Sequence, residues 1–194
     1  MMANPPIPAP TKTKPRPRLT AAELYRLGDI GPAELINGEI VTHMPTGHPH
    51  GFIENIIGAL LFIYLQTNRI GRALTGEVGI ITKRRPYTVR AADVAYISHA
   101  RLSQTSADGY LDVAPELVVE IMSPGNVWSE VQEKLAEYFA LGVQLVWVVD
   151  PRLEQIHVYR ALEMVRLLHK ADTLTGEDVL PGFQVTLTEI FDAE

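Results

Sequence analysis

Apolar positions along this chain alternate with two different periods, which predict strands in some stretches and helices in others. Short β-branched runs predict buried strands, with a turn at Gly76 between the first two. These strands are expected at residues 72–75, 77–83, 90–97, 117–121 and 145–149. Asn37-Gly38 is typical of a type I′ turn that joins strands at residues 33–36 and 39–42. Two later runs, at residues 155–160 and 164–168, indicate a further antiparallel pair.

Helical periodicity appears in two longer stretches. Apolar stripes predict helices over residues 50–68 and 128–141, and Gly142 is a typical C-cap for the second. Thr20-Ala-Ala-Glu23 is a capping box that opens a short helix to about residue 27. Helical turns are also expected within residues 98–114 and at 186–191. The predicted fold class is α/β, with a mixed, mostly antiparallel sheet flanked by helices in one domain over residues 19–194.

Composition narrows the class of protein. The 194 residues suit one domain with a sizeable core. The absence of cysteine excludes disulfides and thiolate metal sites. The apolar runs are too short to span a bilayer, and the N-terminus lacks the apolar core of a signal peptide. We therefore expect a cytoplasmic protein with no membrane contact.

Charge is distributed unevenly. The chain has a net charge of −6, but residues 1–18 contain four basic and no acidic side chains and predict a disordered, Pro-rich basic tail. The rest of the chain carries 13 basic against 23 acidic side chains, a net charge of −10. This balance argues against easy non-specific binding to duplex DNA. One cluster could form a basic patch, and it comprises Lys83, Arg84, Arg85 and Arg90.

Carboxylates within apolar strands indicate a site. Glu120 lies in the run from Leu117 to Ile121, and Asp93 interrupts the strand at residues 90–97. A buried ionised side chain requires a partner charge or a metal. Lys134 lies beside the apolar stripe of the following helix, so its amine could reach the sheet. The same residues also fit a purely structural ion pair between Glu120 and Lys134.

Phosphodiester hydrolysis is the chemistry that this set could perform. It requires a metal held by carboxylates, an activated water and positive charge for the developing oxyanion. Mg²⁺, with Mn²⁺ as a substitute, needs only one or two protein carboxylates. We expect Asp93, Glu120 and the backbone carbonyl of Ile121 as its ligands. Lys134 would orient the water or neutralise charge.

Three further residues are candidates for supporting roles. Glu39 or Glu77 could add a ligand through water, although solvent-facing charges are the simpler interpretation for Glu34 and Glu39 beside the hairpin turn. His50, near the start of the first long helix, could bind a metal or a phosphate group. The aromatic residues could stack on bases, but their apolar context favours core packing. These aromatic residues are Trp128, Trp147 and Tyr138.

A series of motifs over residues 20–191 resembles the Uma-two family of restriction endonucleases, which is similar to the PD-(D/E)XK nuclease superfamily. In chain order the motifs are ELINGE at 34–39, His50, Asp93, VVEIMSP at 118–124, Lys134, YFALGV at 138–143, WVVDP at 147–151 and LPGF at 180–183. The resemblance implies a restriction-endonuclease-like fold. It also implies Asp93 as the first acid of the site, Glu120 as the second, and Mg²⁺-dependent cleavage of DNA by a homodimer.

Two departures qualify the resemblance. Ala92 stands where the family usually has proline, which should affect only local backbone geometry. Met122 stands where the superfamily has its lysine, and Lys134 on the next helix is expected to replace it. Two alternatives to a DNA endonuclease stay open. One is a catalytically weak or inactive nuclease-fold module for binding or regulation, and the other is a hydrolase of small phosphoesters.

Overall fold

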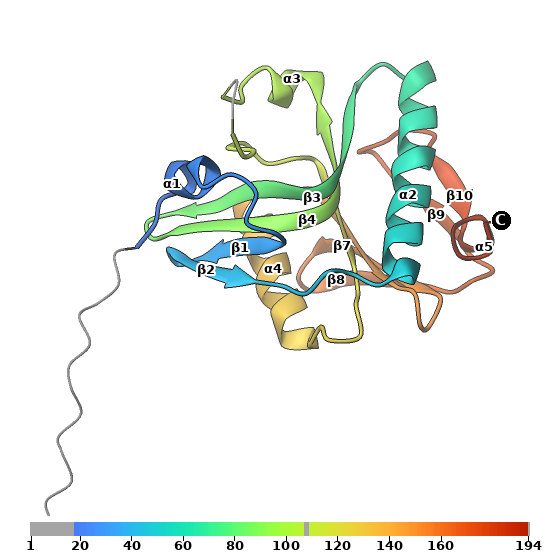
Figure 1. Ribbon diagram of the computed structural model, residues 1–194. Coiled ribbons are helices and arrows are strands. Elements are labelled where there is room, and N and C mark those ends of the chain that lie inside the picture. The colour runs from blue at the N-terminus through green and yellow to red at the C-terminus, as the bar shows by residue number, and fades with distance from the viewer. Residues whose placement is uncertain (1–17, 107–108, 194) are drawn as a thin grey trace, which may run out of the picture.

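The computed structural model describes residues 18–106 and 109–193, which form a sheet with helices on both faces (Figure 1). The helices are α1 (Ala21–Arg26), α2 (His48–Thr67), α3 (His99–Leu102), α4 (Trp128–Leu141) and α5 (Leu187–Phe191). The strands are β1 (Ala33–Ile36), β2 (Glu39–Thr42), β3 (Gly71–Arg84), β4 (Tyr87–Ser98), β5 (Leu117–Ile121), β6 (Leu145–Asp150), β7 (Gln155–Ala161), β8 (Met164–Leu168), β9 (Thr173–Thr175) and β10 (Gln184–Thr186). The predicted basic tail lies outside the described residues, apart from Arg18.

The main sheet has eight strands in the order β2-β1-β4-β5-β6-β7-β8, with β3 paired to β4 off this path. Its neighbouring strands are antiparallel except for β5 and β6, which run parallel. The predicted fold class, a mixed and mostly antiparallel sheet flanked by helices, is therefore confirmed. The sheet order places β4 between β1 and β5, and this brings side chains of three strands to one place.

Several elements begin and end where the sequence predicts. Thr20 and Glu23 form the capping box of α1. Asn37 and Gly38 both have positive φ, at 51° and 84°, as a type I′ hairpin turn requires. β5 and α4 match the predicted bounds, and Gly142 caps α4 in the left-handed conformation.

β3 is one continuous strand where the sequence predicted two strands and a turn. Gly76 and Glu77 are left-handed, with φ of 84° and 61°, and the register with β4 shifts between Thr75 and Val78. This irregularity is a β-bulge, because the strand resumes pairing with β4 beyond it. The two-stranded sheet of β9 and β10 was not predicted, since strands of three residues carry little periodic signal.

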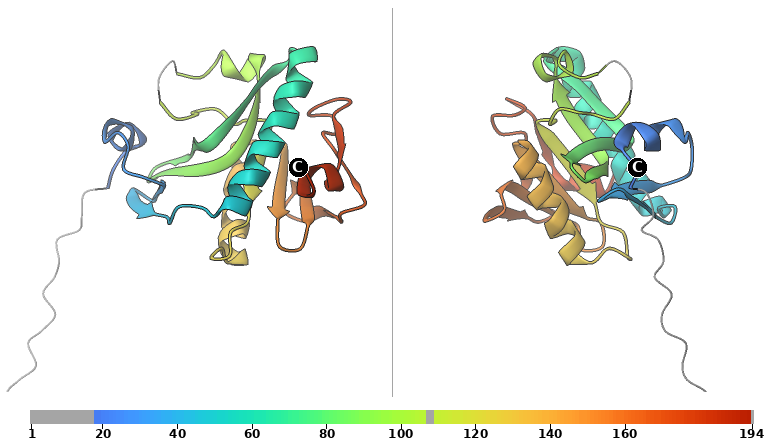
Figure 2. Two further views of the ribbon diagram at one scale, coloured as in Figure 1. Left: turned by 45° about the vertical axis from the view of Figure 1, so that its right-hand side comes forward. Right: turned by 90° about the vertical axis from the view of Figure 1, so that its left-hand side faces the viewer.

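Residues of β5 alternate between two apolar cores on opposite faces of the sheet. Leu117 and Val119 belong to the core that includes the apolar side chains of α2, whereas Val118 belongs to the core that includes Leu135 of α4. Figure 2 shows α2 and α4 on the two sides of the sheet. Because strand residues alternate with a period of two, Glu120 faces α4.

The aromatic residues divide between core and surface. Trp147 is fully buried and stacks on Phe183, and Tyr138 is also fully buried. Trp128 was predicted to pack in the core, and that prediction is wrong. Its side chain is 40% exposed at the start of α4 and lies against the ring of His157. Within the described part of the chain, no helix is both long and apolar enough to cross a membrane.

Candidate active site

The candidate site lies where the pairing of β4 with β5 ends. The last ladder pair is Val94 with Val119, so an extended register would set Asp93 opposite Glu120. Instead, Oδ2 of Asp93 accepts a hydrogen bond of 2.6 Å from the backbone N–H of Ile121. A side chain therefore takes the place of the next ladder bond. This contact fixes the buried Asp93 carboxylate beside the C-terminal end of β5.

Two side chains of α4 contact the carboxylate of Glu120. Nζ of Lys134 lies 2.8 Å from Oε2 of Glu120, and the hydroxyl of Tyr138 donates a hydrogen bond of 2.6 Å to Oε1. Lys134 and Tyr138 are four residues apart, so they share one face of the helix. Lys134 therefore reaches from the helix to the sheet.

Burial governs protonation at this contact. Burial and the nearby charge of Asp93 raise the pKa of Glu120, Lys134 opposes them, and the net result is a pKa of about 7. Burial alone would lower the pKa of Lys134, but Glu120 and Glu34 together raise it above its ordinary value. Lys134 is therefore charged at neutral pH, and Glu120 is poised to exchange a proton there.

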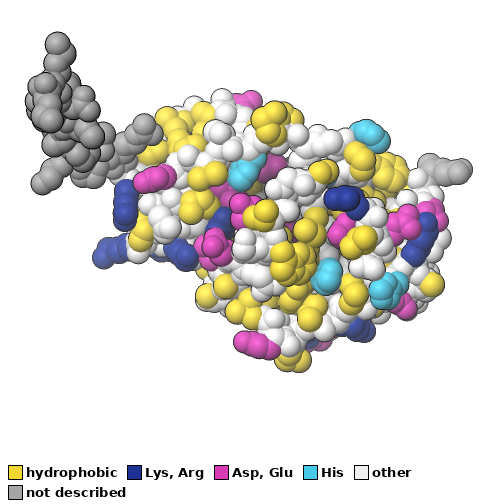
Figure 3. Space-filling view, turned by 90° about the horizontal axis from the view of Figure 1, so that it is seen from below, with side chains coloured by type: hydrophobic (Ala, Val, Ile, Leu, Met, Phe, Trp, Pro, Cys, Tyr) yellow, Lys and Arg dark blue, Asp and Glu magenta, His cyan; other side chains and the backbone are white. Residues whose placement is uncertain are grey.

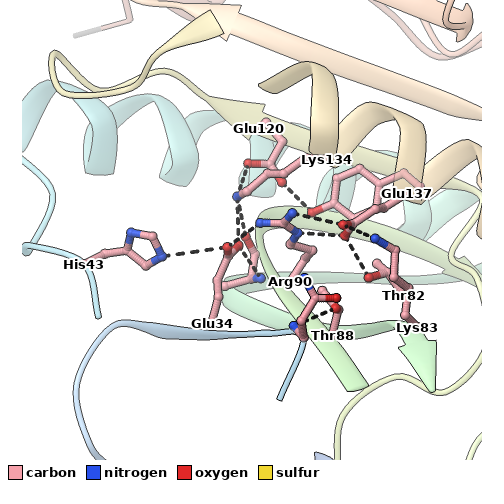
Figure 4. Close-up of polar contacts among 12 residues, drawn as sticks. Glu34, His43, Thr82, Lys83, Thr88, Arg90, Glu120, Lys134 and Glu137 are labelled. Atoms are coloured by element: carbon pink, nitrogen blue, oxygen red, sulfur yellow. Dashed lines mark hydrogen bonds and ion pairs between the residues drawn. The ribbon is translucent and has the colours of Figure 1, made fainter. Parts of the chain in front are cut away.

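Glu34 of β1 completes the surroundings of Lys134 (Figure 4). Its Oε1 lies 3.0 Å from Nζ of Lys134 and accepts a hydrogen bond of 3.0 Å from the backbone N–H of Ala91. Its Oε2 lies 3.0 Å from a guanidinium nitrogen of Arg90. Burial favours protonation of Glu34, but Lys134 and Arg90 hold its pKa below the ordinary value. The sequence favoured a solvent-facing Glu34, and that interpretation is wrong, because Glu34 is 3% exposed.

Arg90 links this cluster to a second carboxylate on α4. Its Nε and Nη2 donate to the two oxygens of Glu137 at 2.7 and 3.0 Å. Lys83 and Thr82 of β3 also donate to Glu137, each at 2.9 Å. Arg90 is buried and Lys83 is paired, so two of the four residues predicted as a possible basic patch are neutralised by acids.

A second group of ligand-type side chains lies on the α2 side of Asp93. Nε2 of His50 is 3.2 Å from Oδ1 of Asp93, and Glu54 follows His50 by one helical turn. Donor atoms of these three residues all lie within 4.8 Å of one another. Glu54 is held by the backbone N–H of Gly76, which donates to it at 2.7 Å. Two carboxylates and an imidazole are a donor set that fits a divalent cation.

His50 is suited to such a site because it is buried with one nitrogen unsatisfied. The residue is 6% exposed, and its Nδ1 has no hydrogen-bond partner among the described residues. Burial would lower the pKa of His50, but the adjacent carboxylate of Asp93 raises it overall. The spacing of His50 and Glu54, four residues apart on one helix, was visible in the sequence. Their approach to Asp93 was not.

Glu77 and Glu39 fare differently. Glu77 lies in the β-bulge of β3 with an exposed side chain, next to Gly76, whose backbone N–H donates to Glu54. Desolvation and the charge of Asp93 raise the pKa of Glu77. Glu39 is exposed on the edge strand β2, paired with Ile36 beside the turn. Among the described residues, no hydrogen bond or ion pair joins Glu39 to the other candidates. The structure thus joins His50 to Asp93, places Glu77 in the adjoining bulge, and leaves Glu39 apart.

Charged groups of several kinds gather on one face of the molecule. The N-terminal ends of α2 and α4 both reach this face (Figure 1). In the view from below, acidic, basic and histidine side chains lie close together on the left half of the face, between areas of hydrophobic surface (Figure 3).

The sequence of this chain matches a known protein family. The family model "Uma2: Putative restriction endonuclease" matches residues 21–188, which is most of the chain. This chain belongs to the Uma2 family. A search of curated proteins finds no match for this Uma2 protein.

Among solved structures, a putative nuclease of the DUF820 family from Anabaena variabilis has a similar fold. Its TM-score is 0.75, with 20% sequence identity over 90% of this chain and 98% of that chain. At this identity the likeness shows the fold, a nuclease-like sheet with flanking helices. The family match indicates a nuclease.

Proposed function

We propose that this Uma2 protein is a divalent-metal-dependent endonuclease that hydrolyses phosphodiester bonds of DNA. The observation that carries the proposal is the position of Asp93. One of its oxygens accepts from the backbone of β5, and the other lies 3.2 Å from His50. This buried carboxylate therefore borders both Glu120 and the group formed by His50 and Glu54.

The residues that would hold the cation are Asp93, Glu120 and the backbone carbonyl of Ile121, with His50 within reach. Mg²⁺ prefers oxygen ligands, whereas an imidazole suits transition cations such as Mn²⁺ better. We therefore expect Mn²⁺ to support activity at least as well as Mg²⁺. Glu77 at the border of the site adds negative charge that would attract either ion.

A bound divalent cation supplies positive charge for a developing oxyanion and lowers the pKa of a bound water. The remaining work belongs to side chains of the protein. Asp93 is fixed by its bond to Ile121, so it would present a carboxylate that needs no reorganisation. Lys134 carries a permanent positive charge beside Glu120 and would face the scissile phosphate. Tyr138 would orient Glu120.

Cleavage of plasmid DNA tests the proposal directly. Purified wild type is incubated with plasmid in EDTA, Mg²⁺ or Mn²⁺, beside the variants Asp93→Asn and Asp29→Asn. Asp29 is exposed and caps only a local turn, so its variant is the matched control. We expect cation-dependent nicking that is lost in D93N and kept in D29N. Cleavage in EDTA, or an unimpaired D93N, would overturn the assignment.

A second candidate function follows from the state of Glu120. Both of its oxygens are already occupied by Tyr138 and Lys134, as in a self-contained structural ion pair. A nuclease fold used for binding or regulation would keep such a pair intact. If the wild type cuts neither DNA, RNA nor a small phosphoester with any divalent cation, this candidate replaces the nuclease. RNA or small-ester cleavage alone would keep the hydrolase and change its substrate.

We also propose a homodimer, because two sites are needed to cut two antiparallel strands in one encounter. Sedimentation equilibrium with and without DNA tests this directly. A mass near twice the 21.5 kDa of one chain supports a dimer, and a monomer bound to cleaved DNA contradicts it.

A further inference from the structure

Three oxygen atoms surround the ammonium group of Lys134. An ammonium group has three N–H donors. Nζ of Lys134 lies 2.8 Å from Glu120, 3.0 Å from Glu34 and 3.2 Å from the carbonyl oxygen of Ala91. These oxygens come from three different strands. The contacts with Glu120 and Ala91 are hydrogen bonds, and the contact with Glu34 is an ion pair. A substrate or a water would therefore approach an ammonium group that already has three oxygen neighbours.

The three acceptors differ in what they would do when a cation arrives. Glu120 is a proposed ligand, so a cation would take over the neutralisation of its charge. Glu34 is held on its other side by Arg90 and by the backbone of Ala91, and it is 3% exposed. It cannot turn away without leaving the buried Arg90 short of a partner. The contacts of Lys134 with Glu34 and with the backbone carbonyl of Ala91 are therefore the ones that would persist.

We propose that Glu34 is a positioning residue, which holds Lys134 in place when Glu120 turns to a cation and so leaves one ammonium hydrogen free for the substrate. The inference rests on the proposed nuclease function and deepens it. Glu34 touches neither the cation nor the substrate in this scheme. It acts only through Lys134, and Arg90 and Glu137 stand behind it as supports.

The side chains around Lys134 also balance one another in charge. Three cationic side chains face three carboxylates in the network, and no group is left unpaired (Figure 4). The cations are Lys83, Arg90 and Lys134, and the carboxylates are Glu34, Glu120 and Glu137. If Glu34 lost its charge, Lys134 would interact more strongly with Glu120 and compete with the cation for it. Cation affinity and turnover should then fall together.

Glu34→Gln and Glu133→Gln form a matched pair for the test. Both remove one carboxylate near Lys134, but Glu133 is exposed on α4 and its charge is screened by water. Mn²⁺ binding is measured by titration calorimetry, and DNA cleavage is measured at saturating Mn²⁺. Loss of a residue that orients a metal-site group typically costs 10–100-fold in affinity or activity. We expect a loss in that range for both quantities in E34Q and wild-type behaviour in E133Q.

Glu34→Asp separates charge from position. The aspartate keeps the negative charge but is one methylene shorter, so it should preserve Mn²⁺ affinity and lower kcat at least tenfold. A folded E34Q that binds Mn²⁺ and cleaves DNA as E133Q does would overturn the proposal. If the Tm of E34Q lies below the assay temperature, an E34D variant with wild-type kcat would overturn the proposal. A wild type without Mn²⁺ binding or cleavage would instead refute the nuclease function.

Discussion

Replacing Arg90 with methionine should destabilise the fold more than any exposed charge deletion. The Arg90 side chain is 7% exposed, and its partners Glu34 and Glu137 are 3% and 9% exposed. Removing one partner of a buried ion pair costs about 3–5 kcal/mol, because the remaining charge is left without compensation. Lys134 and Lys83 still contact the two acids, so we expect the lower end, about 3 kcal/mol.

Thermal and urea unfolding at pH 7 measure this loss. For a chain of this size, a change of 1 kcal/mol shifts Tm by about 2–4 °C, so Arg90→Met should lower Tm by about 6–12 °C. Arg166→Met is the matched control. Arg166 lies 3.5 Å from Glu177 with 53% of its side chain exposed, and such a pair contributes at most about 1 kcal/mol.

The pH dependence distinguishes lost charge pairing from lost packing. Arg90 lowers the pKa of Glu34 and Glu137 in the folded state, against the effect of burial. Near and below pH 4.5, the ordinary pKa, these carboxylates bind more protons in the unfolded state than in the folded state. The stability that pairing contributes is therefore lost as the pH falls through the lowered pKa values of the folded state. The deficit of R90M should be complete above about pH 4.5 and shrink below it. A deficit below about 1 kcal/mol, or one equal at pH 7 and pH 3.5, would refute the reasoning.

Three other predictions concern Glu120, Tyr138 and Glu77. Tyr138→Phe removes a hydroxyl that donates to Glu120 at 2.6 Å, and it should cost about 2 kcal/mol in urea unfolding at pH 8; wild-type stability would contradict this. Burial raises the pKa of Glu120 to about 7, so the folded state holds an extra proton and this residue's contribution to stability falls as pH rises from 4.5 to 7. Glu120→Gln should reduce the slope of the unfolding free energy against pH between pH 4.5 and 7. An unchanged slope would show that other groups cause the pH dependence. Glu77→Gly should raise Tm by a few degrees, about 1 kcal/mol, because φ of 61° favours glycine; a lower Tm would show that the bulge is not strained there.

Local patterns predicted the elements, because each pattern is complete within its own stretch. The apolar run of β5 and the stripe of α4 gave the bounds of both elements, and an acid inside the run drew attention to Glu120. Asn37-Gly38 gave the hairpin for the same reason. Gly76 was ambiguous, since left-handed residues occur in turns and in bulges alike. Only the continuous partner strand β4 decides between them.

The candidate site was predicted in part, because its contacts join distant stretches of the chain. Glu34 and Arg90 are 56 residues apart, and Arg90 and Glu137 are 47 apart. No periodicity relates these positions, so Glu34 could be read as a solvent-facing residue beside a turn. The sheet order, which sets β1 against β4, brings them together. Tyr138 was correctly read as buried, but its hydroxyl contact with Glu120 depends on the placement of α4 above β5.

Lys134 lies on the same helix, α4, that covers one apolar core of the sheet. Leu135, the neighbour of Lys134, is 1% exposed and packs against sheet residues such as Val146. The distance between the Lys134 amine and the sheet is therefore set by the volume of the apolar side chains between the helix and the sheet. Substitution of one of these apolar residues by a larger or smaller one could therefore change the turnover of the proposed nuclease, with every charged residue left unchanged.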